Sequence, residues 1–214
     1  MKLDCVLFDH DDTLLPTFAL RARALREAAR EVLDRELDAE SFLGASQGRN
    51  LEQMSGDITA GDMNLAAALV TAYRQRYYAA NRGGLTPYTG IAELLATLRK
   101  RGIRIGVVTS KLATGARDEL LRTGLSEHIE HLTGAEDVVK HKPAAEPLLR
   151  ATTALQVDPA RTLMVGDTSA DILGARAAGT FGGAALWGAR EPDSLRALNP
   201  DHLLREPADI LQLI

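Results

Sequence analysis

The sequence predicts an α/β fold with a doubly wound, mostly parallel, Rossmann-like sheet and a small all-helical second domain. Two observations support this prediction. From residue 86 onward, short apolar runs typical of buried strands alternate with amphipathic helical patterns, as in open parallel sheets. Between Pro16 and about residue 85, the pattern is helical throughout. We therefore expect a core formed by residues 1–15 and 86–214, with residues 16–85 inserted as a helical domain.

Composition limits the functions to consider. The chain has 214 residues, of which 45% are hydrophobic, enough for a core with a smaller companion domain. The net charge of −4 and the absence of a concentrated basic stretch argue against nucleic acid as a partner. No apolar run approaches a membrane span, no signal segment is apparent, and the single cysteine, Cys5, fits a reducing compartment. We expect a cytoplasmic protein without membrane contacts, and nothing in the sequence indicates its oligomeric state.

Clustered acids follow the first apolar run. Residues 3–8 form this run, which predicts a buried strand, and Asp9 and Asp11 come directly after it. Open parallel sheets bind their ligands beyond the carboxyl ends of the strands. Clustered carboxylates cost energy unless a cation lies among them, and Mg²⁺ prefers oxygen ligands. The alternative interpretation is a simple turn, because Asp and Thr are common turn formers.

The inserted segment shows two long helical patterns. Apolar residues at spacings of three and four predict helices over residues 17–37 and 62–80. Four glycines interrupt residues 41–62, where we expect short helices and turns. The run Asn81-Arg82-Gly83-Gly84 predicts the end of the second long helix, since Gly and Asn suit the left-handed cap.

The remaining elements alternate between strand and helix. Strands are predicted over residues 103–109, 162–166 and 180–186, and around Leu203. Helices are predicted over residues 90–101, 113–123, 144–155, 169–178 and 208–213.

Polar side chains follow three of the predicted strands. They are Asp9 and Asp11 after the first, Thr109 and Ser110 after the second, and Asp167 after the third. Lys142 is followed by Pro143, and proline suits the first turn of a helix, so we expect Lys142 just before a helix start. In one parallel sheet these groups all lie at the same edge.

This set of side chains suits phosphoryl transfer. A carboxylate can attack phosphorus and form an acyl phosphate. A second carboxyl group can protonate the leaving oxygen and later activate water. A metal ion offsets the repulsion between the nucleophile and the phosphate, while a hydroxyl and an ammonium neutralise the other phosphate oxygens.

Four segments in this order resemble the motifs of the haloacid dehalogenase superfamily. They are Asp9-His10-Asp11-Asp12-Thr13-Leu14, Val107-Val108-Thr109-Ser110-Lys111, Lys142-Pro143 and Val165-Gly166-Asp167-Thr168-Ser169-Ala170-Asp171. The resemblance is closest to the phosphoglycolate-phosphatase-like branch, including Thr86-Pro87-Tyr88-Thr89-Gly90. Residues 16–85 occupy the place where that superfamily inserts a helical cap after the first strand. One departure is Asp12, where many members have glycine; aspartate tolerates unusual backbone angles better than most residues.

The resemblance implies a role for each acid. Asp9 would be the nucleophile that becomes phosphorylated and a Mg²⁺ ligand. Asp11 would be the general acid and base, and would give its backbone carbonyl to the metal. Asp167 would be a further Mg²⁺ ligand, with Asp171 as a ligand or as a partner of one.

The resemblance also implies which residues bind the phosphate. Thr109 and the Ser110 amide would bind the transferring phosphoryl group, and Lys142 would steady both the nucleophile and the phosphate. Residues 44–50 resemble the cap loop that approaches the substrate, and Arg49 is the candidate there because guanidinium pairs well with carboxylate or phosphate. An exposed arginine in a glycine-rich loop is the alternative.

Asp11 favours a phosphatase, because true dehalogenases of the superfamily lack an acid there. We therefore predict a Mg²⁺-dependent phosphatase that acts on a small phosphate ester, phosphoglycolate-like or a sugar phosphate, through a phospho-aspartyl intermediate. The alternatives are a sugar phosphomutase like β-phosphoglucomutase, an inorganic pyrophosphatase, and a non-catalytic binding protein, which the filled catalytic positions disfavour. We interpret His10 as a residue without a role in the reaction and Trp187 as a packing residue. For the lysine that steadies the nucleophile and the phosphate, we favour Lys142 over Lys140.

Overall fold

The computed structural model describes residues 3–46, 48–82 and 84–214, and the chain forms two compact units. The first, here called the sheet unit, comprises the chain up to Pro16 together with Thr86–Ile214. The second, the helical unit, comprises Thr17–Leu85. Gln47 and Gly83, which belong to segments singled out in the sequence, lie outside the described residues.

The sheet unit contains the parallel sheet that the sequence predicts. Its strands in the described part of the chain are β1 (Cys5–Phe8), β2 (Arg104–Val108), β3 (His131–Thr133), β4 (Thr162–Gly166), β5 (Phe181–Ala185) and β6 (His202–Leu204). Their order is β3-β2-β1-β4-β5-β6, and every neighbouring pair is parallel. The α/β fold class is therefore confirmed, and β1 lies between β2 and β4, inside the sheet.

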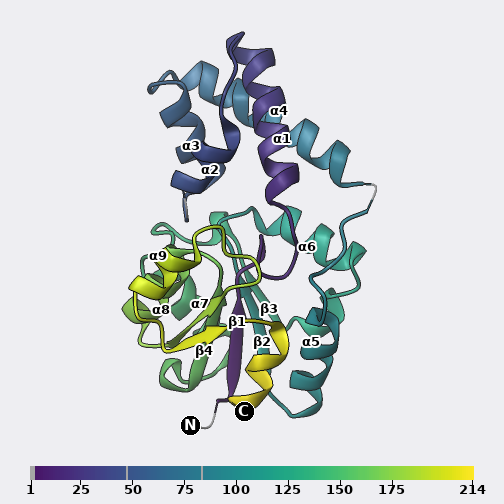
Figure 1. Cartoon of the computed structure of the whole chain (residues 1–214), viewed down its shortest axis with the longest axis vertical. Coiled ribbons are helices and arrows are strands. Elements are labelled where there is room, and N and C mark those ends of the chain that lie inside the picture. The colour runs from purple at the N-terminus through teal and green to yellow at the C-terminus, as the bar shows by residue number, and fades with distance from the viewer. Residues whose placement is uncertain (1–2, 47, 83) are drawn as a thin grey trace. The chain divides into compact units, whose positions relative to one another are not determined.

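Helices cover the sheet on both faces (Figure 1). They are α5 (Ile91–Lys100), α6 (Ala113–Arg122), α7 (Glu146–Leu155), α8 (Ser169–Ala178) and α9 (Pro192–Ala197). Short 3₁₀ segments in the described part of the chain accompany them: η1 (Ser126–His128), η2 (Ala135–Asp137), η3 (Pro159–Arg161) and η4 (Pro207–Gln212). All four residues of β1 are fully buried, as expected for a strand covered on both faces. Cys5 and Leu7 pack in one cluster with Leu148 of α7 and Ala175 of α8.

The structure corrects some element predictions. The predicted C-terminal helix is the 3₁₀ segment η4, and β3 and α9 were not predicted. The prediction that Pro143 opens a helix is wrong: α7 begins at Glu146, and Pro147 is the proline in its first turn. Lys142 and Pro143 form a turn. The Glu146 carboxylate stabilises the preceding residues by accepting hydrogen bonds from the Val139 and Lys140 backbone N–H groups.

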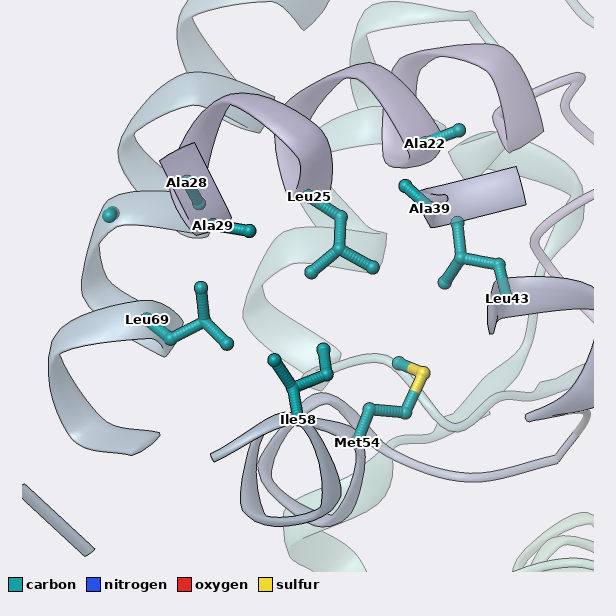
Figure 2. Packing of buried hydrophobic residues seen from close by; sticks show 10 residues of the cluster. Ala22, Leu25, Ala28, Ala29, Ala39, Leu43, Met54, Ile58 and Leu69 are labelled. Atoms are coloured by element: carbon teal, nitrogen blue, oxygen red, sulfur yellow. The ribbon is translucent and has the colours of Figure 1, made fainter. Parts of the chain in front are cut away.

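The helical unit has a hydrophobic core of its own (Figure 2). Its described helices are α1 (Phe18–Leu33), α2 (Ala39–Ala45), α3 (Leu51–Ile58) and α4 (Met63–Asn81). Leu25 of α1, Met54 and Ile58 of α3, and Leu69 of α4 are buried together in this core. Asn50 and Asp62 cap α3 and α4, which explains where these helices begin. Among the described residues, no helix has both the length and the apolar character required to cross a bilayer.

Candidate active site

The chain turns sharply after β1, and this turn presents the first acids. The Asp9 backbone N–H still donates to the Val165 carbonyl of β4 at 2.8 Å, so Asp9 is held at the carboxyl end of the sheet. The His10 backbone N–H donates to Asp9 Oδ1 at 2.7 Å, which fixes the carboxylate orientation. Asp12 adopts a left-handed conformation with φ of 58°, in the region that favours glycine.

Three buried carboxylates and one lysine meet at this end of the sheet. Asp9, Asp167 and Asp171 each offer an oxygen, and these oxygens lie within 4.8 Å of one another. The Lys142 Nζ atom is 3.2 Å from Asp9 Oδ1 and 2.6 Å from Asp171 Oδ1. It also donates to the Val108 carbonyl at the end of β2, at 3.0 Å. The structure thus joins side chains of three motifs found in the sequence and, through the Val108 carbonyl, the backbone of the fourth.

Burial and neighbouring charges shift the pKa values of residues in this group. It raises the pKa of Asp9 to about 6; Lys142 opposes the shift, and the charges of Asp171 and Asp11 add to it. Burial, with the charges of Asp9, Asp171 and Asp12, raises the pKa of Asp167 well above its usual range. Burial alone would lower the pKa of Lys142, but the Asp171 and Asp9 carboxylates outweigh it and the pKa rises. Lys142 therefore stays charged, and this one ammonium lies among three carboxyl groups.

These residues fit a divalent cation. Carboxylate oxygens are the donors that Mg²⁺ prefers, and a cation would offset the repulsion that raises the pKa values of Asp9 and Asp167. Asp171 is engaged by protein donors, since its Oδ1 accepts from Lys142 and its Oδ2 from the Thr168 hydroxyl at 2.6 Å. Asp167 Oδ1 accepts from the Thr13 hydroxyl at 2.8 Å.

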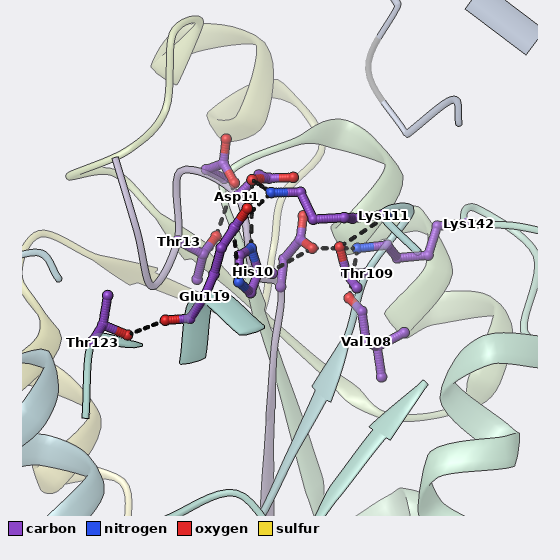
Figure 3. Close-up of polar contacts among 11 residues, drawn as sticks. His10, Asp11, Thr13, Val108, Thr109, Lys111, Glu119, Thr123 and Lys142 are labelled. Carbon is purple, nitrogen blue, oxygen red and sulfur yellow. Dashed lines mark hydrogen bonds and ion pairs between the residues drawn. The ribbon is translucent and has the colours of Figure 1, made fainter. Parts of the chain in front are cut away.

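Thr109 and Ser110 follow β2 at the same edge. Thr109 is buried, and its backbone N–H donates to the Thr133 carbonyl of β3 at 3.0 Å. Its hydroxyl accepts from the Lys111 backbone N–H at 3.1 Å, so the chain folds back on itself there. Figure 3 shows Thr109 directly after Val108, whose carbonyl accepts a hydrogen bond from Lys142.

Asp11 belongs to a second charged group, which the sequence analysis did not identify. Lys111 Nζ lies 2.9 Å from Asp11 Oδ1 and 2.7 Å from Glu119 Oε2 of α6 (Figure 3). His10, treated above as a residue without a role in the reaction, is fully buried, and its two ring nitrogens each lie 3.4 Å from one of these carboxylates. An available signal was an acid, Glu119, on the same helical face as the buried Ala116 and Leu120.

The loop after β5 supports the turn that carries the acids. Trp187 Nε1 donates to the Thr13 carbonyl at 2.9 Å, so this residue does more than pack. A Cβ atom at Gly188 would overlap the Asp12 carbonyl, so only glycine allows the two loops to approach so closely.

Arg49 lies in the helical unit. Its guanidinium forms an ion pair with Asp57, and its side chain is 43% exposed. A role for Arg49 in substrate binding stays a prediction.

The chain is similar to proteins that are already known. Residues 6–184 match the family model described as haloacid dehalogenase-like hydrolase. Pyrophosphatase PpaX of Halalkalibacterium halodurans is 30% identical over 220 residues, which cover 100% of this chain and 98% of that protein. Pyrophosphatase PpaX of Bacillus mycoides is 29% identical over 217 residues, which cover 100% of this chain and 98% of that protein.

A solved structure shows the same fold. A protein from Haemophilus somnus 129pt, described as a predicted phosphoglycolate phosphatase, superposes with a TM-score of 0.88. The match covers 100% of this chain and 98% of that chain at 19% identity, a level at which the likeness concerns the fold alone.

Proposed function

Because the chain belongs to the haloacid dehalogenase-like hydrolase family, we propose that it is a Mg²⁺-dependent phosphatase that hydrolyses a small phosphate ester through phosphorylated Asp9. One observation carries the proposal. The Asp9 carboxylate is buried at the end of the central strand, with the Lys142 ammonium at 3.2 Å and the Asp167 carboxylate in the same group. A nucleophilic carboxylate, a phosphate-binding cation and a cation-binding acid are the parts that this chemistry requires.

In the first half of the reaction, an Asp9 oxygen attacks phosphorus. The bond from phosphorus to the leaving oxygen breaks, and the Asp11 carboxyl group donates its proton to that oxygen. Thr109 and the Ser110 amide bind the phosphoryl oxygens, and Lys142 neutralises their charge beside Asp9. The product is an acyl phosphate on Asp9.

In the second half, water hydrolyses the acyl phosphate. Asp11, now a carboxylate, takes a proton from the attacking water, and phosphate leaves with Asp9 regenerated. Asp9, Asp167 and the Asp11 backbone carbonyl would hold Mg²⁺, with Asp171 as a further ligand or as a partner of one. When bound, the ion supplies charge that offsets repulsion between the nucleophile and the phosphate.

The helical unit is proposed to act as a cap that selects the substrate, with Arg49 as its candidate anion contact. Phosphoglycolate-like esters and sugar phosphates are the first substrate class. Inorganic pyrophosphate is the second candidate, and the full-length similarity to two proteins named pyrophosphatase PpaX favours it.

A phosphate-release screen tests the proposal. The panel contains p-nitrophenyl phosphate, phosphoglycolate, several sugar phosphates and pyrophosphate, each with Mg²⁺ and with EDTA. We expect at least one substrate with kcat/KM of about 10⁴ M⁻¹s⁻¹ or more, with activity lost in EDTA and restored by excess Mg²⁺. The highest kcat/KM for pyrophosphate would select the second candidate. Release that is equally fast in EDTA would contradict the metal-dependent mechanism.

A further inference from the structure

Lys111 is held between two carboxylates at the edge of the candidate active site. Its ammonium lies 2.9 Å from Asp11 Oδ1 and 2.7 Å from Glu119 Oε2 (Figure 3). The side chains are 12% exposed for Lys111, 14% for Asp11 and 0% for Glu119. The lysine therefore connects the proposed proton donor to an acid that has no access to solvent.

Because Glu119 is buried, its carboxylate needs a partner within the protein. A buried carboxylate destabilises the fold unless a partner compensates its charge. Glu119 lies on α6, and its backbone carbonyl accepts a hydrogen bond from the Thr123 hydroxyl at 2.7 Å, which adds a contact to this part of the helix. Its carboxylate points to Lys111 rather than to solvent, so it fixes the end of a long, flexible side chain.

The Lys111 ammonium has a carboxylate on either side, so its charge is paired within the protein. His10, Asp11 and Glu119 could by their spacing hold a metal ion. The Lys111 ammonium already contacts two of the three, so the protein itself supplies the cation of this group.

We propose that Lys111 and Glu119 are positioning residues for Asp11, with Glu119 anchoring Lys111 and Lys111 holding the Asp11 carboxyl group. This inference rests on the proposed function. As the bond from Asp9 to phosphorus forms, the bond from phosphorus to the leaving oxygen breaks and its electron pair accepts the Asp11 proton. Asp11 is left as a carboxylate, and the fixed ammonium stabilises the negative charge that appears there.

The loss of kcat/KM on removing Lys111 should depend on the leaving group of the substrate. An alkoxide requires a proton as it leaves, whereas p-nitrophenolate is stable without one. Steps up to departure of the leaving group determine kcat/KM, so hydrolysis of the later acyl phosphate does not obscure the comparison.

The test measures kcat/KM for p-nitrophenyl phosphate and for an alkyl phosphate, in the wild type and in Lys111→Met. We expect the ratio of the aryl to the alkyl value to rise by about 10-fold or more, since positioned general acids contribute about 10²–10⁴-fold. Glu119→Gln should also raise the ratio. In Lys111→Arg the ratio should lie between the values for Lys111→Met and the wild type. Lys100→Met, which removes an exposed lysine of α5, is the matched control and should leave the ratio unchanged.

An unchanged ratio of the aryl to the alkyl kcat/KM in both Lys111→Met and Glu119→Gln would overturn the inference. With native circular dichroism, an equal loss for both esters would indicate a general structural role, and no loss for either ester would show that the two residues do not act on Asp11. Failure of the wild type to release phosphate from any substrate of the panel would instead refute the proposed function, so the two failures are distinguishable.

Discussion

At Asp9, burial and the neighbouring charges act on a single carboxyl group. Burial, together with Asp171 and Asp11, raises the pKa to about 6 from an ordinary 3.8, although Lys142 opposes the shift. Without a cation, the folded protein therefore holds a proton on Asp9 at pH values where the unfolded chain has lost it. Such a group contributes stability below about pH 4 that is lost as the pH rises toward 6.

The first residue-scale prediction compares the wild type with Asp9→Asn in EDTA. Asparagine has a similar shape but no charge, so it avoids the cost of ionising a buried acid. We expect the wild type to lose stability relative to the variant between pH 4.5 and pH 7. Urea denaturation of both proteins at the two pH values measures this. A difference in unfolding free energy that stays constant, or that moves in favour of the wild type at pH 7, would contradict the assignment.

Sequence patterns identified the residues of this group better than the contacts between them. Asp9, Thr109 and Asp167 follow strands whose carboxyl ends meet at one edge, so their proximity follows from topology alone. The contact between Lys111 and Glu119 depends on the direction of α6 after β2 and on side-chain rotamers, which no spacing rule encodes.

At the scale of elements, the junction between β4 and α8 depends on the close packing of Gly166 against Asp171. Asp171 and Thr168 form a reciprocal capping box at the start of α8, and Asp171 also binds Lys142. A Cβ atom at Gly166 would overlap the Asp171 carboxyl group. Glycine at this position therefore lets Asp171 cap α8 and bind Lys142 at the same time.

The element-scale prediction is that Gly166→Ala lowers both stability and turnover. Overpacking of this kind costs about 1–3 kcal/mol, and Asp171 must move away from Lys142. Urea denaturation and kcat measure the two effects. Gly182→Ala in β5 is the control, because its Cβ would meet its neighbours at 3.5 Å or more, an ordinary contact. Equal stability and kcat for both variants would show that the Gly166 contact has no role.

Helices with clear end signals were predicted well. The predicted range of α8 is correct to the residue, because Thr168 caps its start and Gly179 ends it in a left-handed conformation. The edge strand β3 has three residues and α9 has six. Segments this short do not establish a period in the sequence.

At the scale of the whole molecule, the chain leaves the sheet unit after Pro16 and returns at Thr86. Each unit has its own buried core, so the helical unit interrupts the sequence of the sheet unit without interrupting its sheet. In the sequence, the helical period and the alternating pattern likewise occupy separate parts of the chain.

The proposed chemistry of the molecule depends on one oxygen nucleophile, and phosphate release by Asp9→Asn tests it most directly. The measurement uses the best substrate of the panel with saturating Mg²⁺. Asp193→Asn, in which the replaced side chain is 95% exposed, serves as the matched control. We expect Asp9→Asn to lose about 10³-fold or more of kcat, because covalent catalysis needs the carboxylate, while the control retains wild-type turnover. Turnover by Asp9→Asn within a few-fold of the wild type would contradict the phospho-aspartyl mechanism.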